Sequence, residues 1–365
     1  MSTSAIAAKK SAKPGDAAPA LVVSALGVCC RSGDQPFALF GAVATPMSGA
    51  EADAQLSLAV PEGEGDAQVL TARFAALGDH EDPHERMGLL AESALGQALK
   101  SLPEEFNWER LLILTLVPDG RNPRALTSPA LQQLHMDLSR LRAGLSRAVF
   151  RFVSCADGAV SQLQAVCGEM KQGEWRAVLF GGVDSLIDLV TCTLLAQEDR
   201  IATTHNSEGL VPGEGAAYVL LQQEPASAPL ARLAGIGCAV EPHAGAAADK
   251  RMTGLAAAIA DCLAGRRLSP SSLDCVVAPH DGSLSGALEW HQTIETLYPR
   301  RESAPRNFEV LLPYRSFGEL GAAALPMALV LACARFEFDH PVVRRVMVCE
   351  TGDFAQRGAV LLLSP

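Results

Sequence analysis

The sequence contains few aromatic residues, no long hydrophobic run and no excess of positive charge. Phe, Trp and Tyr make up 5% of the 365 residues, and the formal net charge is −11. A negative chain with scattered Lys and Arg has no electrostatic reason to bind nucleic acid or an anionic membrane. The longest apolar stretch, residues 320–334, contains Gly321 and Pro326 and is shorter than the roughly 20 residues of a membrane-spanning helix. We expect it to form a buried helix.

The ten cysteines include no Cys-x-x-Cys pair. They stand in apolar surroundings, without the spacing of a disulfide-bonded scaffold or of a structural zinc site, so we expect reduced thiols and a cytoplasmic location. Residues 1–19 are small and polar and lack the apolar core of about 7–15 residues found in signal peptides. We interpret them as a disordered leader.

No nucleotide-binding or metal-binding motif is present, so no cofactor is predicted. Gly213 and Gly215 precede a predicted strand instead of opening a helix, which is wrong for a dinucleotide-binding loop.

The chain repeats one pattern twice. An apolar strand followed by a turn of small residues occurs at residues 20–29 and again at 229–238. A glycine followed by a buried strand occurs at residues 213–221 and again at 356–363. Matched beginnings and matched ends indicate a duplicated α/β unit.

We place the N-terminal half at residues 20–223 and the C-terminal half at 229–365, joined by a segment with two prolines among small residues, 224–229. Short β-like runs alternate with helical patterns, which predicts buried sheets with helices packed on their faces. The predicted strands are 111–117, 148–153, 177–180, 274–278 and 343–349. The predicted helices are 85–100, 156–171, 253–264 and 320–336. Between residues 44 and 82 we predict a loop or insertion, because Gly, Pro and acidic residues replace the pattern.

One cysteine, Cys155, stands at a strand-turn-helix junction within residues 150–160 (FRFVSCADGAV). A thiol at a helix N-terminus meets backbone amides and the positive end of the helix dipole, both of which favour the thiolate. The alternative is that Cys155 is a small buried apolar residue. We predict that Cys155 is a nucleophile.

Four motifs, in this order, carry a resemblance to a known family. They are residues 22–28 (VVSALGV), 154–159 (SCADGA), 179–185 (LFGGVDS) and 212–217 (PGEGAA). Their order and spacing resemble thiolase-fold proteins, and among them the β-ketoacyl synthases, over nearly the whole chain. The resemblance implies an α/β fold of duplicated halves in a layered αβαβα arrangement. It also implies a dimer, with sheets that continue across a two-fold interface.

Resemblance to ketosynthases also implies a reaction. The thiol accepts an acyl group from the thioester of an acyl carrier protein or acyl-CoA, and a malonyl extender then loses CO₂ and attacks the acyl-enzyme. This chemistry uses two histidine donors and an oxyanion hole of backbone amides. His280 follows an apolar strand and falls at the position of the first histidine. Its neighbour Asp281 replaces a glycine and would favour imidazolium; the alternative is a solvated loop histidine.

The second histidine is missing. Residues 314–324 (YRSFGELGAAA) resemble the family's Lys-Ser-x-x-Gly-His-x-x-Gly-Ala-Ala-Gly with one residue fewer, and Glu319 is the nearest replacement. An ionised carboxylate cannot donate to a developing enolate and has the wrong charge beside departing CO₂, which argues against ordinary decarboxylative condensation. The alternative is that Glu319 stabilises a helix N-terminus. Arg315 and Ser316 correspond to the motif's Lys-Ser and are substrate-binding candidates.

A further departure lies near the C-terminus. Residues 352–358 (GDFAQRG) stand where ketosynthases carry Gly-Phe-Gly-Gly-Thr-Asn. Ala355 and Gln356 replace glycines, which restricts φ and would close the oxyanion hole. Phe354 matches the phenylalanine that gates the thiol in the family; the alternative is that it fills the core.

Three functions stay open. The preferred hypothesis is a ketosynthase-like acyltransferase, as a homodimer, in which Cys155 is acylated and His280 assists. The second is a non-catalytic subunit that pairs with a ketosynthase, as chain-length factors do. The third is an adaptor or chaperone for a type VI secretion effector. Retention of the thiol favours the first.

Overall fold

The computed structural model describes residues 20–45, 48–59, 65–78, 80, 82–223, 229–244, 250–298 and 308–365. The predicted leader and residues 224–228 of the predicted join lie outside this part of the chain. Within it, no helix is long and apolar enough to cross a membrane. All ten cysteines are free thiols.

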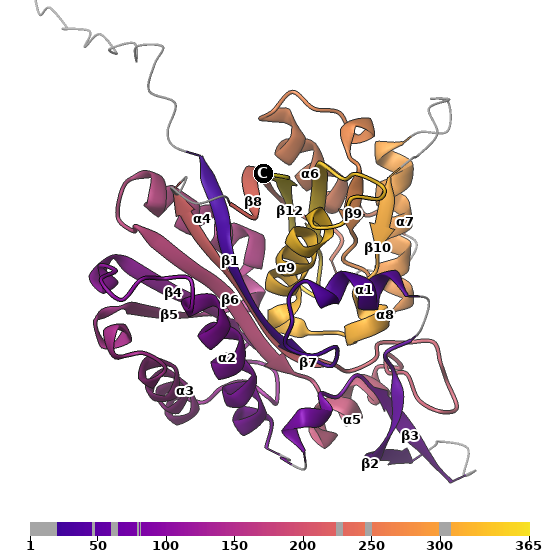
Figure 1. The fold of residues 1–365 in the computed structure, drawn as a ribbon. Helices are drawn as coiled ribbons and strands as arrows, with labels where there is room; N and C mark the ends of the chain where they lie inside the picture. Colours follow the sequence, from indigo (N-terminus) through magenta and orange to yellow (C-terminus); the bar gives the residue numbers. More distant parts are fainter. Residues whose placement is uncertain are drawn as a thin grey trace, which may run out of the picture.

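A mixed sheet of ten strands runs through the molecule in the order β10-β9-β11-β12-β8-β1-β7-β6-β4-β5 (Figure 1). Its strands are β1 (Leu21–Cys30), β4 (Leu111–Val117), β5 (Val149–Ser154), β6 (Ala177–Ser185), β7 (Glu214–Gln223), β8 (Ala231–Val240), β9 (Cys275–Val277), β10 (Glu309–Leu311), β11 (Arg345–Glu350) and β12 (Gln356–Leu363). Strands β4, β6 and β9 are buried along their whole length, and β1, β7, β11 and β12 along most of it, as expected for a sheet covered on both faces.

The two ends of this sheet have the same topology. The order β1-β7-β6-β4-β5 matches β8-β12-β11-β9-β10 strand for strand, and in both the first two pairings are antiparallel and the last two parallel. The halves meet where β1 pairs with β8 through Val22↔Arg232 and Val23↔Ala231. This repeated topology confirms the duplicated α/β architecture predicted from the matched strand patterns.

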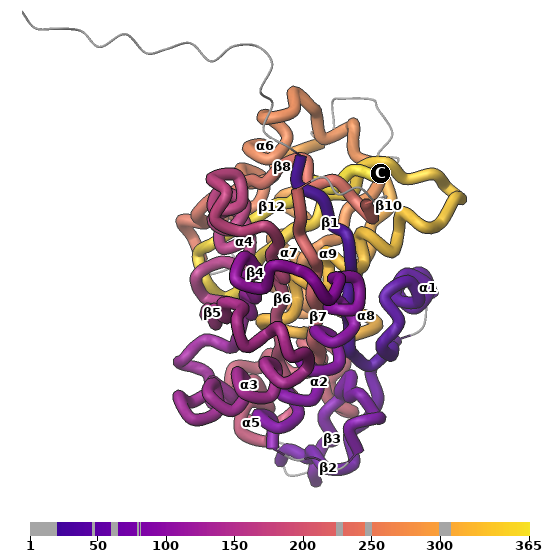
Figure 2. The backbone as a smooth tube through the Cα atoms, turned by 60° about the vertical axis from the view of Figure 1, so that its left-hand side comes forward, coloured from indigo at the N-terminus to yellow at the C-terminus, as the bar shows by residue number. Residues whose placement is uncertain are grey.

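Helices form three layers around the two half-sheets. The central layer contains α4 (Ala159–Lys171) and α9 (Ala324–Phe336), which contact strands of both halves. The outer helices are α2 (Pro83–Leu99) and α3 (Ser128–Arg140) on the N-terminal half, and α6 (Gly254–Ala264) and α7 (Leu284–Leu297) on the C-terminal half. The result is the layered αβαβα arrangement (Figures 1 and 2).

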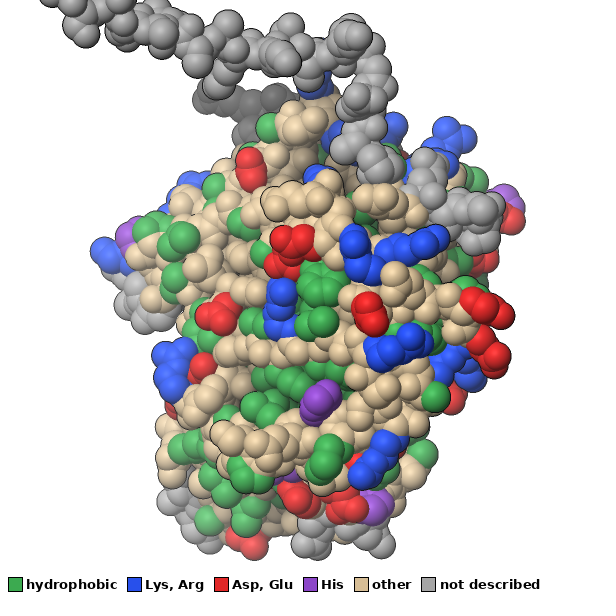
Figure 3. Space-filling model, turned by 90° about the vertical axis from the view of Figure 1, so that its left-hand side faces the viewer, with side chains coloured by type: hydrophobic (Ala, Val, Ile, Leu, Met, Phe, Trp, Pro, Cys, Tyr) green, Lys and Arg blue, Asp and Glu red, His purple; other side chains and the backbone are tan. Residues whose placement is uncertain are grey.

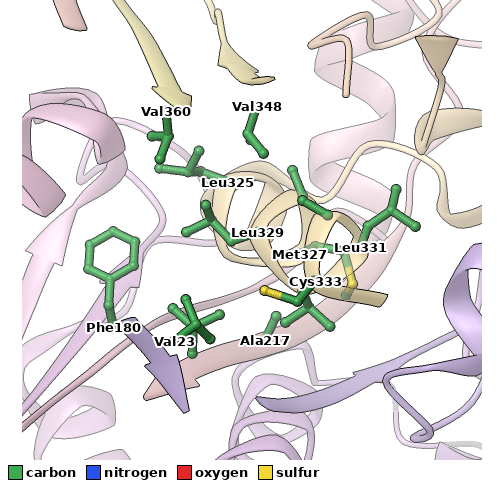
Figure 4. Close-up of a cluster of buried hydrophobic side chains, with 14 of the residues drawn as sticks. Val23, Phe180, Ala217, Leu325, Met327, Leu329, Leu331, Cys333, Val348 and Val360 are labelled. Atoms are coloured by element: carbon green, nitrogen blue, oxygen red, sulfur yellow. The ribbon is translucent and has the colours of Figure 1, made fainter. Parts of the chain in front are cut away.

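Helix α9 is the centre of the hydrophobic core, as the apolar run at 320–334 predicted. Its residues from Leu325 to Arg335 are all buried. Figure 4 shows α9 between Val23 and Phe180 of the N-terminal half and Val360 of the C-terminal half. A helix that is apolar on all sides suits this position, because both of its faces are covered by sheet.

The remaining elements include two corrections. The interval 44–82 is not only loop: β2 (Glu51–Ala59) and β3 (Asp66–Thr71) form an antiparallel hairpin at the end of the molecule opposite α6 (Figure 2). Strand β2 is largely exposed and β3 is only six residues long, so the pair gives a weak hydrophobic pattern in the sequence. The sequence prediction also missed α3, α7 and α5 (Leu189–Gln197). Short helices α1 (Ala38–Ala44) and α8 (Tyr314–Phe317) complete the α-helices of the described residues.

Candidate functional site

A cavity of about 570 Å³ opens where the carboxyl ends of parallel strands from both halves meet. Strands β4, β5 and β6 are parallel, as are β9, β10 and β11. Each of these six strands is followed by a residue that lines the cavity: Asp119 after β4, Cys155 after β5, Leu186 after β6, His280 after β9, Tyr314 after β10 and Thr351 after β11. Ligand sites in open α/β sheets form at such strand ends, because the loops that leave them converge.

Four of the six site residues predicted from the sequence line this cavity: Cys155, His280, Glu319 and Phe354. They come from both halves of the chain. The other two lie outside it. Ser316 is buried and donates its hydroxyl to the carbonyl of Ala42 (3.0 Å), and Arg315 is exposed, with its guanidinium near the Tyr314 hydroxyl.

Cys155 begins a single turn, η4 (Cys155–Asp157), directly after β5, and its side chain is half-buried. The next helix, α4, starts at Ala159. Its first amides are already occupied, because Ala159 N–H and Val160 N–H donate to the carboxyl of Glu350 at 2.5 and 2.8 Å. A carboxyl group from β11 therefore takes the position at the helix N-terminus that the sequence suggested for the thiol.

The thiol of Cys155 is not activated, because its pKa is raised and not lowered. Burial, followed by the negative charge of Asp184, raises the pKa of Cys155 to about 12, although a backbone hydrogen bond from Asp119 and the charge of Arg124 act in the opposite direction. The expectation that the helix N-terminus favours the thiolate is therefore wrong. At neutral pH Cys155 is a thiol.

A buried ion pair stands beside Cys155. Arg124 Nε donates to Asp184 Oδ1 (2.7 Å) and Arg124 Nη2 to Oδ2 (3.2 Å), and both side chains are almost inaccessible to solvent. Asp184 also accepts from the amides of Ser185 and Ala322, both at 2.9 Å. Since Ala322 precedes α9, this carboxylate ties β6 of one half to the central helix of the other.

His280 is held by its own loop. Its Nδ1 accepts a hydrogen bond from Gly282 N–H (2.9 Å), and its ring stacks on Tyr314 with 4.6 Å between ring centroids. A neutral imidazole that accepts at Nδ1 carries its proton on Nε2, so His280 is a hydrogen-bond donor through Nε2. Although burial opposes it, the neighbouring His280 and hydrogen bonds from Ser283 lower the pKa of Asp281, which stays ionised.

Glu319 lies between α8 and η6 (Gly321–Ala323), the turn that leads into α9. Its Oε1 accepts from Gly321 N–H (2.9 Å). Burial, then the charge of Asp281, with smaller contributions from Asp184 and Asp353, raises the pKa of Glu319 to about 8. Glu319 is therefore mostly protonated at pH 7. A protonated carboxyl group can donate a hydrogen bond, which an ionised one cannot.

Phe354 belongs to the loop between β11 and β12 and lines the cavity. The guanidinium of Arg121 lies over its ring, 5.0 Å from the centroid, while Arg121 Nε also pairs with Asp119 (2.7 Å). The adjacent Asp353 accepts from Arg200 Nη2 (2.9 Å). Two contacts thus hold this loop against segments of the N-terminal half.

Sequence reasoning missed three residues that shape this site: Arg124, Glu350 and Thr191. Arg124 lies in the loop after β4, Glu350 ends β11, and Thr191 is in the first turn of α5. A weak signal was available for Glu350, since a polar residue at the end of an otherwise apolar strand is a site candidate in this fold class. Arg124 and Thr191 stand in irregular or unpredicted segments. In the described residues, no group of His, Cys, Asp and Glu is arranged to hold a metal ion.

No family model matches the sequence, and no curated protein matches it. Solved structures do match. One match is a chain from the complex titled "type II PKS acyl-carrier protein in complex with its ketosynthase bound to the hexaketide". Its TM-score is 0.71 and its identity 14%, and the match covers 95% of this chain and 100% of that chain. The ketosynthase ApeO in complex with its chain length factor ApeC, from Xenorhabdus doucetiae, gives 0.70 and 17%, covering 95% and 98%. A β-ketoacyl synthase from Burkholderia phymatum gives 0.68 and 14%, covering 95% and 100%.

The chain therefore has the thiolase-like fold that ketosynthases and chain length factors share, which confirms the resemblance seen in its motifs. At this level of identity the likeness establishes the fold, and the chemistry has to be argued from the site.

Proposed function

We propose that this protein is a ketosynthase-like acyltransferase that forms an acyl-thioester on Cys155, taking the acyl group from an acyl carrier protein or acyl-CoA. One observation carries the proposal. Cys155, His280, Glu319 and Phe354 come from distant parts of the sequence and line one cavity of about 570 Å³. A cavity of this size can hold a thioester together with a medium-length acyl chain.

The chemistry follows from the protonation states. Cys155 attacks the thioester carbonyl, its new C–S bond replaces the donor's C–S bond, and the thiol proton passes to the departing thiolate. The carbonyl oxygen gains negative charge in the transition state. His280 Nε2–H and the protonated carboxyl of Glu319 are the donors that the cavity offers for this charge.

Mass spectrometry of the intact protein tests the proposal. We expect incubation with octanoyl-CoA or an octanoyl-carrier protein to add one octanoyl group, located on the Cys155 peptide. Cys155→Ala should abolish the adduct, whereas Cys238→Ala, which removes the other half-buried thiol, should retain it. An unmodified wild-type protein, or an adduct of equal yield in Cys155→Ala, would contradict the proposal.

The second candidate is a non-catalytic subunit that pairs with a ketosynthase. The unactivated thiol favours it, and so does the free edge of the sheet at β5. The face that carries this edge has hydrophobic side chains gathered near its middle (Figure 3), with exposed Val149 on β5 and Met136 and Leu141 at α3. An edge strand beside apolar side chains is a surface that a second sheet can extend.

Size-exclusion chromatography with light scattering separates these candidates. A stable homodimer that is acylated on Cys155 supports the acyltransferase. A monomer that forms a 1:1 complex with a co-expressed ketosynthase, without acylation, supports the subunit. The role as adaptor or chaperone for a type VI secretion effector stays a prediction from the sequence.

A further inference from the structure

Three arginines lie side by side at the amino ends of neighbouring parallel strands in the N-terminal half. Arg110 and Arg176 directly precede β4 and β6, and Arg147 stands two residues before β5. Extending the pairing of β4 with β5 and β6 back to these positions places Arg110 opposite both Arg147 and Arg176, and Arg176 N–H donates to the carbonyl of Arg110 (2.9 Å). Paired strands are about 4.8 Å apart, so the three Cα atoms form a row about 10 Å long, the arginine row.

The arginine row carries positive charge that the rest of the described chain does not neutralise. All three residues are exposed, and none forms an ion pair with another described residue. The guanidinium of Arg110 donates to the carbonyl of Gly173, at the turn after α4. Lys171, at the end of α4, is a further exposed cation, whereas the exposed Glu109 and Glu174 are close in sequence but pair with no member of the row. Like charges at opposite positions of neighbouring strands are unfavourable, so the row is costly in the free protein.

The C-terminal half shows that the topology does not require this row. Its strands β9, β10 and β11 correspond to β4, β5 and β6, and the positions aligned in the same way are Asp274, Phe308 and Arg345. This set contains one cation and one carboxylate, and Asp274 accepts a hydrogen bond from Arg345 N–H (2.9 Å). Positive charge therefore accumulates at the strand starts of one half and not at those of the other, although both halves have the same fold.

The place of the row separates it from the acyl chemistry. The cavity lies at the carboxyl ends of β4, β5 and β6, and the row lies at their amino ends. The seven residues of β4 span about 23 Å. A carrier protein that hands an acyl group to Cys155 has to dock at the cavity end, so the row serves a different contact.

The chemistry of the row selects an acidic helix as its partner. All three cations are arginines, whose planar guanidinium matches a carboxylate through two hydrogen bonds. The net charge of −11 repels long polyanions such as nucleic acid, whereas a short acidic segment needs only the local charge of the row. Successive turns of an α-helix are about 5.4 Å apart, close to the spacing of the row.

We propose that the arginine row binds an acidic α-helix of a partner protein, in which Glu or Asp side chains on three successive turns each pair with one arginine. This interaction goes beyond the acyltransferase function and does not depend on it, because no member of the row lines the cavity.

NMR titration of the full-length, isotope-labelled protein tests the proposal. The probe is an alanine-rich helical peptide of about 20 residues with Glu on successive turns, and the same peptide with Gln is its control. We expect saturable amide shifts at the row with the Glu peptide and none with the Gln peptide. Combining Arg110→Ala, Arg147→Ala and Arg176→Ala should raise Kd at least about tenfold, as expected for the loss of three exposed ion pairs.

A matched variant removes the same number of exposed arginines from the C-terminal half: Arg251→Ala, Arg266→Ala and Arg344→Ala. It should keep the Kd of the wild type. No saturable shift at the row, equal shifts with the Gln peptide, or an equal loss of affinity in both variants would overturn the proposal. Tighter binding of a short oligo(dT) that depends on the row would overturn it in favour of nucleic acid.

The carrier protein is tested separately. If the variant of the row accepts an octanoyl group from octanoyl-CoA as the wild type does, but no longer from an octanoyl-carrier protein, the row is the docking surface of the carrier and the proposed second partner is excluded. Equal acylation from both donors supports a separate partner. The peptide titration does not use Cys155, so it decides the proposal even if the acyltransferase function fails.

Discussion

Replacing Glu319 with glutamine should make the protein more stable at alkaline pH and change its stability much less at pH 5. The pKa of Glu319 rises from its usual 4.5 to about 8 in the folded protein, because burial and Asp281 oppose its ionisation. Between these values the folded chain holds a proton that the unfolded chain has lost, so stability falls as the pH rises through this window. Glutamine mimics the protonated carboxyl group and cannot ionise.

The size of the effect follows from that pKa. At about 1.4 kcal/mol per pKa unit, the rise corresponds to an upper limit of about 5 kcal/mol. Glu319 borders a solvent-accessible cavity, so water screens part of this penalty, and we expect about 2–4 kcal/mol at pH 9. The Gly321 amide keeps its acceptor in the variant, since the glutamine carbonyl oxygen replaces Oε1.

Urea unfolding followed by circular dichroism at pH 5, 7 and 9 measures this difference. The free energy of unfolding of Glu319→Gln, relative to wild type, should increase steadily across the series. Glu105→Gln, at an exposed position, should follow the wild type at every pH. The same difference between Glu319→Gln and wild type at pH 5 and pH 9 would show that Glu319 is ionised normally, and the donor role proposed for it would fail.

The remaining predictions concern the thiol, the ion pair beside it and the core. Since the pKa of Cys155 is about 12, its alkylation rate with iodoacetamide should rise about tenfold per pH unit from pH 7 to 10, measured on the Cys155 peptide; a plateau near neutral pH would contradict this. Arg124→Met leaves the buried charge of Asp184 unpaired and should cost about 3–5 kcal/mol in urea unfolding; a loss below about 1 kcal/mol would show that the pair is not needed. Leu331→Ala, at a fully buried position, should cost about 2–5 kcal/mol, whereas Met136→Ala, at a position 43% exposed, should cost less than about 0.5; equal losses would contradict the placement of α9 in the core.

Much of the fold could be predicted because its strands are buried on both faces. Largely apolar runs, such as 111–117 and the residues 346–349 that end the predicted strand 343–349, are visible in the sequence without any tertiary information. The apolar run at 320–334 predicted α9 in the same way. Strand β2 and helix α5 were missed because hydrophobic periodicity reports burial on one face or both, and these elements leave much of their surface exposed; β3 is short and pairs only with β2.

The site was predictable where a chemically active residue directly follows a recognisable strand. Cys155 follows β5 and His280 comes shortly after β9, so their positions were found from the order of the motifs. Arg124, Thr191 and Glu350 were not found. Their importance depends on which side chains lie near them in space, and those partners are up to about two hundred residues away along the chain, as Val160 is from Glu350.

The sequence by itself determined the duplicated α/β pattern and the fact that polar and nucleophilic residues follow its strands, because both depend on local composition and periodicity. The tertiary structure alone decided their protonation states. It brought Glu350 to the amides of α4, Asp184 toward Cys155, and Asp281 toward Glu319. Charges act through space and burial removes water from around them, so the pKa of each group depends on neighbours that its own stretch of sequence does not contain.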